Sequence, residues 1–363
     1  MSFRENDFSR LELRLPACKA NYRYFRSLLE PETRLLVLVK ANAYGHGLLE
    51  VAKTLSDADA YAVARIEEAL ELRCGGIVKP IILLEGLFNP EDVQVVSASN
   101  LETAVGSWEQ LEWIEKAHLQ SPVKVWMALN TGMHRLGLNE DEAEEFYSRL
   151  MKSENVVKPI GLISHLSCAD DLSSDYTKKQ IEVFRRFASA HECHTALANS
   201  AGILSWPESH TDYVRPGIIL YGVSPYDGKT GEDLGLKPVM TLKSNLIAVR
   251  KVRKGDKVGY GATWTASRDT RLGIVAMGYG DGYPRQAPNG TPVLINGRIA
   301  GTAGHVCMDM MAIDLGPDST DRVGDEVILW GRGLPVEKIS ELVGTIPYEL
   351  VLRLTDRVVK EYV

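Results

Sequence analysis

The sequence is poor in cysteine, and the cysteines that it has do not form a set. Cys18, Cys74, Cys168, Cys193 and Cys307 are odd in number and widely spaced, and no two of them form a Cys-x-x-Cys motif. A disulfide framework or a cysteine-based metal site requires closely matched spacings. The pattern therefore predicts reduced thiols and a cytoplasmic location.

Long apolar runs are also missing. No stretch approaches the roughly 20 apolar residues that a membrane-spanning helix needs. The first seven residues, MSFREND, lack the apolar core of a signal peptide. We therefore expect neither a membrane segment nor a cleaved leader.

Positive charge is in deficit as well. The 363 residues include 41 Lys and Arg against 48 Asp and Glu, which gives a net charge of −7. Such a balance disfavours nucleic acid or an anionic membrane as a partner.

Metal-ligand types gather in only one short stretch, His191-Glu192-Cys193-His194. This stretch lacks the i, i+4 spacing of a helical site and has no second pair of ligands elsewhere. A metal site and a solvated loop both fit the residue types, and the spacing favours the loop. We predict no metal.

What the chain does contain is an ordinary globular composition, with 45% hydrophobic and 25% charged residues. The length suggests two domains, or one barrel with an added domain.

The chain is organised around residues 35–47, LLVLVKANAYGHG. Five consecutive apolar residues predict a strand buried on both faces, as in a parallel sheet. Lys40 follows at the end of this strand, where burial would lower its pKa and make its amine nucleophilic. A lysine in this position is a Schiff-base candidate, although a lysine whose stem lies over a barrel strand would look the same.

Short apolar strands alternate with stretches of helical period over about 230 residues, as expected for βαβ units and a (β/α)₈ barrel. The strands expected are Leu35–Lys40, Tyr61–Val63, Ile81–Leu84, Thr103–Val105, Val123–Leu129, Ile160–Ser164, Thr195–Ala198 and Gly217–Leu220. The helices expected between and before them include Leu15–Leu29, Leu48–Leu55, Ile66–Arg73, Trp108–Ala117, Glu140–Met151 and Lys178–Ala190.

The pattern changes near Pro238, where alternation replaces helical period. Asn296-Gly297 between two apolar segments is a strong hairpin signal. We predict a barrel domain over residues 1–235 and a mainly antiparallel β domain over 236–363. The first ten or so residues could pair with the second domain.

Polar groups lie near the carboxyl ends of the expected barrel strands, where ligands bind in such folds. They are Lys40 with Tyr44, Arg135, His165, and the turn Asn199-Ser200. Each has a simpler explanation alone: an arginine can be a surface residue, and Asn-Ser can cap a helix. Their common position at strand ends favours a functional site.

A phosphate site is expected after the seventh and eighth strands, where exposed backbone N–H groups bind anions. Ser200, Gly217 and Ile218 are placed for it. A lysine amine beside a phosphate site indicates pyridoxal phosphate. Arg215 would face the pyridine nitrogen of that cofactor and, having only donors, would keep the nitrogen unprotonated. The ring would then be a shallow electron sink, which suits a short-lived carbanion and not transamination.

The expected β domain contains tyrosines flanked by glycines, among them Tyr260 and Tyr279. They could be packing aromatics on strands. Tyr260 could instead be a general base if cationic neighbours lower its pKa.

Several motifs together resemble bacterial alanine racemases, over nearly the whole chain. They are Lys40–Gly47, the Thr131–Gly137 segment TGMHRLG, Arg215-Pro-Gly-Ile218, Val258-Gly-Tyr260-Gly, Gly278-Tyr-Gly-Asp-Gly282 and Cys307-Met-Asp309. The resemblance implies a fold-type III pyridoxal-phosphate enzyme, with an N-terminal barrel, a C-terminal β domain and a head-to-tail homodimer.

The resemblance also implies roles on the cofactor side. Lys40 would hold the cofactor and act as one of two bases. Tyr44, Ser200, Gly217 and Ile218 would bind the phosphate, with Asn199 beside them. Arg215 would meet the pyridine nitrogen, and His165 would touch the ring and hydrogen-bond Tyr260.

On the substrate side, Tyr260 from the other subunit would be the opposing base. Arg135 would bind near the cofactor's phenolic oxygen and the substrate carboxylate. Tyr279 and Met308 from the partner would narrow the pocket, and the backbone N–H of Met308 would face the substrate carboxylate.

Three positions depart from the family pattern. Ala128 stands where many members carry a carbamylated lysine, so we expect a chloride ion or a water near Arg135 and Asn130 in its place. Asp356 stands where some members place a tyrosine on the phosphate, and His305 replaces the usual arginine before the Cys-Met-Asp motif.

The implied activity is racemisation of alanine, supplying D-alanine for peptidoglycan. Because some broad-specificity racemases also lack the carbamylated lysine, that activity is the first alternative. A non-catalytic pyridoxal-phosphate carrier would resemble the barrel alone, and an aldolase would use Lys40 without a cofactor.

Overall fold

The computed structural model describes residues 8–363, which form two compact units. The barrel unit comprises Tyr22–Leu220 and Pro225–Asp227. The β unit comprises the described residues up to Asn21, Tyr221–Ser224 and Gly228–Val363. The division of the chain at residue 235 stays a prediction, since the units exchange short segments around it.

Eight parallel strands close the barrel in sequence order, as predicted. They are β2 (Arg34–Leu38), β3 (Ala60–Val63), β4 (Ile81–Leu83), β5 (Glu102–Val105), β6 (Lys124–Ala128), β7 (Ile160–Ile163), β8 (Cys193–Ala196) and β9 (Tyr213–Val214). β9 pairs with β2 and completes the ring. Residues 35–39 are buried, because barrel strands face side chains on the inside and helices on the outside.

The expected eighth strand was wrong. Residues 218–221 form a 3₁₀ turn, Ile218–Tyr221, and the eighth strand is the shorter β9 just before Arg215. Arg215 therefore follows the carboxyl end of a strand, whereas the expected strand Gly217–Leu220 would have begun after it. Cys193 and His194 also belong to a strand, β8, and not to a loop.

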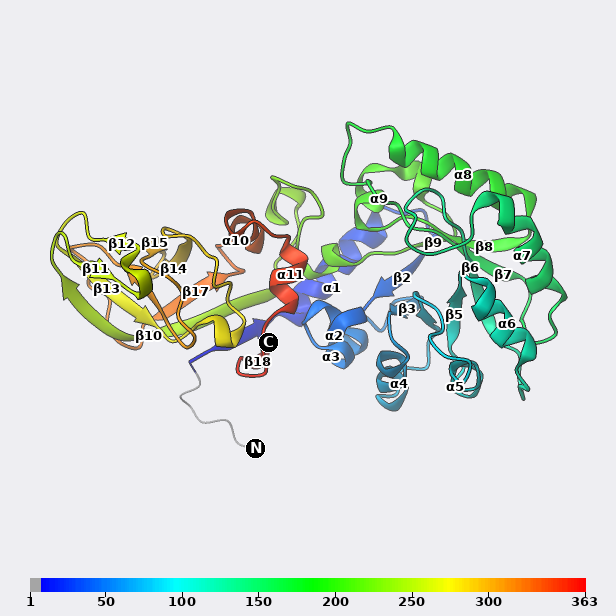
Figure 1. Ribbon diagram of the computed structural model, residues 1–363, viewed down its shortest axis with the longest axis horizontal. Helices are drawn as coiled ribbons and strands as arrows, with labels where there is room; N and C mark the ends of the chain where they lie inside the picture. Colours follow the sequence, from blue (N-terminus) through cyan, green and yellow to red (C-terminus); the bar gives the residue numbers. More distant parts are fainter. Residues whose placement is uncertain (1–7) are drawn as a thin grey trace. The chain divides into compact units, whose positions relative to one another are not determined.

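The helices surround the barrel strands in Figure 1. They are α1 (Leu15–Ser27), α2 (Lys40–Tyr44), α3 (Leu48–Thr54), α4 (Ile66–Cys74), α5 (Asp92–Ala98), α6 (Trp108–Lys116), α7 (Glu140–Lys152), α8 (Tyr176–Ala190) and α9 (Ser200–Ser205). Local signals begin several of them: the Ser107 hydroxyl accepts the Gln110 N–H at α6, and Asn139 with Glu142 forms a capping box at α7.

The β unit contains an eight-stranded sheet in the order β13-β16-β15-β14-β17-β10-β1-β18, and β13 also pairs with β10. The strands are β1 (Arg10–Leu13), β10 (Met240–Val252), β13 (Thr270–Val275), β14 (Pro292–Ile295), β15 (Arg298–Thr302), β16 (Met311–Asp314), β17 (Glu326–Trp330) and β18 (Val359–Tyr362). All pairs are antiparallel except β1 with β18, so the predicted antiparallel domain is confirmed with one parallel addition.

One hairpin of the β unit follows directly from the sequence. Asn296 and Gly297 both have positive φ, 45° and 75°, and turn β14 into β15 as a type I′ hairpin requires. Two helices, α10 (Val336–Val343) and α11 (Pro347–Leu352), lie between β17 and β18 in the chain.

Candidate active site

The predicted barrel residues all lie at the barrel mouth, by which we mean the loops after the carboxyl ends of β2–β9. Lys40 and Tyr44 follow β2, Arg135 follows β6 and His165 follows β7. Asn199 and Ser200 follow β8, and Arg215, Gly217 and Ile218 follow β9. The structure thus brings residues that are distant in sequence to one end of one barrel.

Lys40 begins a left-handed turn. Ala41, Asn42, Ala43 and Tyr44 have φ of 51°, 54°, 51° and 53°, a conformation that costs about 1–2 kcal/mol for each non-glycine residue. The Asn42 side chain accepts the Leu48 N–H (2.8 Å), and His46 Nδ1 lies 2.8 Å from the Tyr44 carbonyl. Strain of this kind collects at functional sites, where surrounding contacts hold it in place.

The Lys40 ammonium sits among charges of both signs. Burial is the largest influence on its pKa and lowers it from the usual value. Glu85 and Glu68 oppose this effect, whereas the nearby Arg135 and Arg215 add to it. A depressed pKa increases the fraction of neutral amine, which is the form that attacks a carbonyl carbon.

Arg215 is only 5% exposed and is held by backbone carbonyls. Its Nη2 donates to Leu197 O at 2.9 Å and to Ser164 O. Burial, followed by the charge of Arg135, lowers its pKa to about 10, so the guanidinium stays charged near neutral pH. Its Nε is buried and has no partner in the described chain, although a buried N–H normally has an acceptor. The site therefore offers one unused, charged donor.

His165 is neutral beside this guanidinium. Burial, together with Arg215, Arg135 and Lys40, lowers the pKa of its imidazole to about 3. The Nη2 of Arg215 lies 3.4 Å from His165 Nδ1, and because guanidinium can only donate, Nδ1 is the acceptor. Nε2 then carries the hydrogen and is free to act as a donor.

The His165 pKa has a consequence for stability. The unfolded chain binds a proton at His165 below about pH 6.5 and the folded chain only below about pH 3, so stability falls as pH drops through this window. We expect His165→Gln to show a shallower loss of the urea midpoint over that range. The exposed His194→Gln control should keep the wild-type dependence, and equal slopes for all three proteins would contradict the prediction.

Ser200, Gly217 and Tyr44 form a small polar cradle. The Gly217 N–H donates to the Ser200 hydroxyl at 3.0 Å. A Cβ atom on Gly217 would lie 2.8 Å from the Tyr44 hydroxyl, so the close approach requires glycine. Ile218 begins the 3₁₀ turn, where backbone N–H groups have no partner within the turn. The cradle thus presents hydroxyls and N–H groups suited to a phosphate.

Asn199 supports this cradle from behind. Its side chain accepts the Gly202 N–H at 2.9 Å and donates to Leu166 O at 3.1 Å. Asn199 is therefore the cap of α9, which was the simpler of the two explanations for it, and it fixes where Ser200 begins.

We expect Gly217→Ala to displace the Tyr44 hydroxyl from the cradle. Since φ at Gly217 is not positive, alanine adds crowding and no backbone strain. The half-saturating concentration of a phosphate-bearing ligand held in this cradle should rise about tenfold, equivalent to about 1.4 kcal/mol, with little change in melting temperature. Fluorescence titration measures the effect, and unchanged affinity would show that the cradle tolerates the methyl group.

Arg135 is exposed, and within residues 8–363 no carboxylate pairs with it. Asn130 is fully occupied: its amide oxygen accepts the N–H groups of Gly132 and His134, and its nitrogen contacts His134 and Asn139. A direct ion pair between Arg135 and a carboxylate would have excluded a chloride ion or a water there. The described residues contain no such pair. The Cβ of Ala128 lies against the backbone at Gly106, and Gly137 lies next to both.

The remaining predicted residues belong to the β unit. Tyr260 lies in a turn, Tyr260–Ala262, between the short strands β11 (Lys257–Val258) and β12 (Trp264–Thr265), and it is 73% exposed. Tyr279 also lies in a turn, Tyr279–Asp281. Neither tyrosine lies on a strand, so the alternative that they are packing aromatics on strands does not hold.

Tyr279 and Met308 are held next to one another. The Tyr279 N–H donates to Cys307 O (3.0 Å) and the Gly280 N–H to Met308 O (2.8 Å). Arg357, which the motifs did not single out, bridges the two segments through Asp281 at 3.2 Å and Asp309 at 2.8 Å. The only feature of the sequence that could have pointed to Arg357 is its position one residue after Asp356. The carbonyl of His305 accepts from the Cys307 thiol at 3.7 Å.

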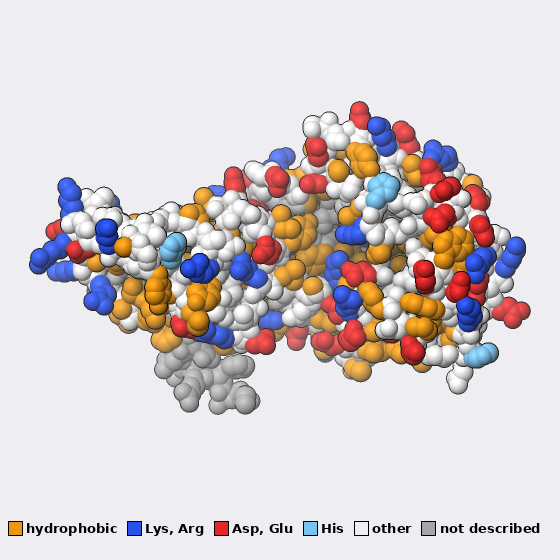
Figure 2. Space-filling model, viewed as in Figure 1, with side chains coloured by type: hydrophobic (Ala, Val, Ile, Leu, Met, Phe, Trp, Pro, Cys, Tyr) orange, Lys and Arg blue, Asp and Glu red, His pale blue; other side chains and the backbone are white. Residues whose placement is uncertain are grey.

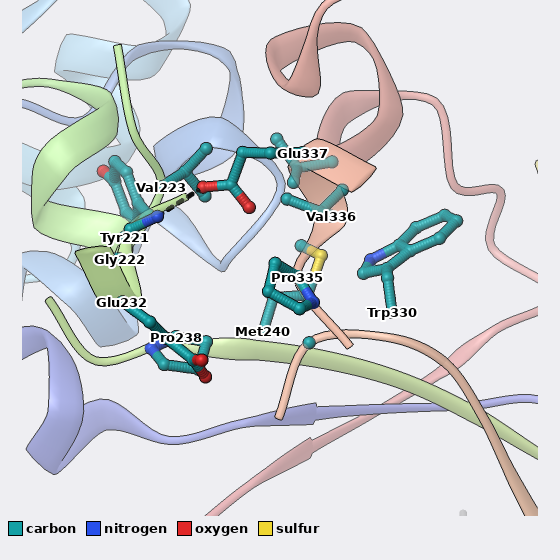
Figure 3. A pocket seen from close by; sticks show the side chains of 13 residues that line it. Tyr221, Gly222, Val223, Glu232, Pro238, Met240, Trp330, Pro335, Val336 and Glu337 are labelled. Carbon is teal, nitrogen blue, oxygen red and sulfur yellow. Dashed lines mark hydrogen bonds between the residues drawn. The ribbon is translucent and has the colours of Figure 1, made fainter. Parts of the chain in front are cut away.

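A small cavity in the β unit contains none of the predicted site residues. Glu337, Met240 and Trp330 are among the side chains that surround it (Figure 3). The Glu337 carboxylate accepts the N–H groups of Ser224 (2.9 Å) and Gly231 (2.8 Å), while burial raises its pKa. The Trp330 ring also stacks on Tyr283. The residues that line this cavity do not include any residue of the barrel mouth.

The described residues 8–363 contain no group of three His, Cys, Asp or Glu side chains placed to hold a metal. His191 is occupied by Glu144 and by the Phe187 carbonyl. Across the same residues, no helix is both long and apolar enough to span a membrane. Figure 2 shows acidic and basic side chains interspersed over the visible face of the barrel unit, without a continuous basic surface.

Comparison with known proteins covers nearly the whole chain. Residues 13–225 match the family described as alanine racemase, N-terminal domain, and residues 239–362 match its C-terminal domain. An alanine racemase from Aeromonas hydrophila is 58% identical over 92% of this chain and 93% of that protein. The biosynthetic alanine racemase of Escherichia coli K12 is 56% identical over 92% of this chain and 94% of its own length.

Solved structures agree with the sequence relatives. A crystal structure of biosynthetic alanine racemase from Pseudomonas aeruginosa superposes with a TM-score of 0.95 at 42% identity, covering 99% of this chain and all of that one. Alanine racemase from Enterococcus faecalis superposes with a TM-score of 0.91 at 30% identity over the full length of both chains. With both domains matched and the fold shared, this chain belongs to the alanine racemase family.

Proposed function

We propose that this chain interconverts L-alanine and D-alanine with pyridoxal 5′-phosphate, and so supplies D-alanine for peptidoglycan. Family membership supports the reaction. The barrel mouth supports the assignment of this cofactor, because a half-buried lysine amine, an unpartnered charged donor and a hydroxyl-lined cradle lie at the same end of the barrel.

The residues present fit this cofactor at three points. The Arg215 Nε, a donor without a partner among the described residues, suits an unprotonated pyridine nitrogen. The Ser200 and Tyr44 hydroxyls and the Ile218 N–H suit the phosphate. Lys40 suits the aldehyde carbon. When bound, the cofactor withdraws electrons from the Cα of an attached amino acid and makes its proton acidic.

Two bases on opposite faces are needed, since reprotonation of a planar carbon from the original side would retain configuration. We assign the Lys40 amine to one face and the Tyr260 phenol of a second copy of the chain to the other. This assignment requires a homodimer with shared sites. His165, whose Nε2 carries the hydrogen, would donate to the Tyr260 oxygen and so hold the phenol in place.

The substrate carboxylate would be held by Arg135 and by the backbone N–H of Met308 from the second copy. Tyr279 and Met308, fixed together by Arg357, would set the width of the pocket. A narrow pocket favours a substrate with a methyl side chain. Because Ala128 removes the usual lysine, a chloride ion or a water would complete the surroundings of Arg135.

The assay is direct: purified protein with added pyridoxal phosphate should form D-alanine from L-alanine. A panel of alanine, serine and lysine separates this function from broad-specificity racemisation, the alternative that Ala128 favours. Comparable rates on all three substrates would contradict specific racemisation of alanine and support broad-specificity racemisation. Activity that depends on chloride, tested by exchange into gluconate buffer, would identify chloride at Arg135, and its absence would favour water.

We further propose a cytoplasmic location. All five cysteines are free thiols in the structure, as expected for a reducing compartment.

A further inference from the structure

The left-handed turn after Lys40 needs support from outside its own sequence. Its internal hydrogen bonds, such as the one from the Gly45 N–H to Ala41 O at 3.1 Å, could also form in a right-handed turn. They therefore do not by themselves select the left-handed conformation. The N–H of Ala41, the first strained residue, points away from the turn and donates to Oε1 of Glu68. Glu68 lies in α4, on the next βα unit of the barrel.

The second oxygen of Glu68 is used as fully as the first. Oε2 accepts the N–H of Ala64 at 3.0 Å and that of Arg65 at 3.1 Å, in the connection between β3 and α4. One carboxylate therefore joins the β2–α2 turn to the β3–α4 connection through three backbone donors. Only a carboxylate accepts at both ends, because the amide of glutamine has one acceptor and one donor group.

We propose that Glu68 is a positioning residue, which fixes the left-handed turn so that Lys40 and Tyr44 reach the barrel mouth together. Tyr44 lies at the other end of the same turn and contacts the cradle at Gly217. A relaxed turn would move the two side chains independently and separate the amine from the phosphate site. The importance of this arrangement for catalysis rests on the proposed function. The support that Glu68 gives to the turn does not depend on it.

Glu68 also acts on Lys40 through its charge. The charged groups that act on the Lys40 amine are Glu85 after β4, Glu68, Arg135 after β6 and Arg215 after β9. Glu68 raises the Lys40 pKa and so opposes the two arginines. Removing its charge should therefore shift the protonation of Lys40 towards lower pH, an effect that a purely mechanical contact would not produce.

The test compares Glu68→Gln with Glu67→Gln, the exposed neighbour in the first turn of α4. Three measurements are made: amide hydrogen exchange of residues 39–47 without cofactor, the pH profile of Lys40 acylation by acetic anhydride, and fluorescence titration with pyridoxal phosphate. For Glu68→Gln we expect exchange to be about tenfold faster and half-saturation about tenfold higher. The acylation profile should move to lower pH, and Glu67→Gln should match the wild type in all three.

Unchanged exchange in Glu68→Gln, or an equal change in Glu67→Gln, would overturn the proposal. If Glu68→Gln does not fold, Glu68→Asp replaces it: the charge is kept while the reach shortens, so exchange should rise without the shift in acylation. Failure of the proposed function gives a different outcome, in which the wild type binds no pyridoxal phosphate while the exchange difference persists.

Discussion

Replacing Lys40 by alanine is expected to reduce the rate of alanine racemisation by at least about 10⁴-fold, because under the proposed function the change removes both the covalent anchor of the cofactor and one of two bases. Either loss alone would account for a large part of this factor. The measurement is D-alanine formation from L-alanine with pyridoxal phosphate in excess, so that weak binding does not limit the rate.

A matched control is available at the other end of the barrel. Lys124 begins β6, is exposed, and pairs with Glu102 at 3.5 Å. Active sites of such barrels lie at the carboxyl ends of the strands and not at the amino ends, so Lys124→Ala should retain nearly full activity. If Lys40→Ala kept activity within tenfold of the wild type, the amine could be neither the anchor nor a base.

Tyr260→Phe is expected to lower turnover by roughly 10²–10⁴-fold, the contribution of one positioned general base. The side chain is 73% exposed in this chain and its hydroxyl supports no described packing, so stability should change little. Binding of pyridoxal phosphate should persist, because the cradle and Lys40 are untouched. Full activity in this variant would remove Tyr260 from the mechanism.

The same variant tests whether the site is shared between copies. In the proposed homodimer, Lys40→Ala and Tyr260→Phe should each be nearly inactive alone, whereas a mixed dimer should have one site with both residues intact. Random exchange of subunits should restore about a quarter of wild-type activity in a symmetric dimer. No recovery after demonstrated exchange would place both residues in the same copy's site or leave one outside it.

The barrel could be predicted from the sequence because its strands are short apolar runs separated by helical periods. The eighth strand shows the limit of that reasoning. Gly217–Leu220 is as apolar as a buried strand, and a short apolar run cannot be told from a buried turn by periodicity. The actual strand, β9, has two residues and carries no pattern.

The positions of the candidate side chains could be predicted from the sequence, whereas the contacts around them could not. Lys40 and His165 could be located because each follows an expected strand, and parallel strands end on the same side. Arg215 was expected just before a strand, and the structure places it just after β9. The left-handed turn could not be predicted, because alanine and tyrosine rarely adopt positive φ and the contact with Glu68 that helps to hold the turn arises only in the folded chain. The unpartnered Nε of Arg215 likewise depends on which carbonyls occupy its other donors.

The sequence left open whether the tyrosines of the β unit lie on strands or in turns, although glycines flank them. Gly259 and Gly261 have φ of 74° and 73°, which breaks the alternation that the surrounding residues suggest. Arg357 was missed because its two carboxylate partners, Asp281 and Asp309, lie far from it in sequence.

The central claim is that the amine of Lys40 binds the cofactor aldehyde at the barrel mouth. Incubation of the purified protein with pyridoxal phosphate, reduction with borohydride and peptide mapping by mass spectrometry tests it directly. We predict one phosphopyridoxyl group per chain, on the peptide that contains Lys40. A label on another lysine, or none on Lys40 after saturation with the cofactor, would contradict the account.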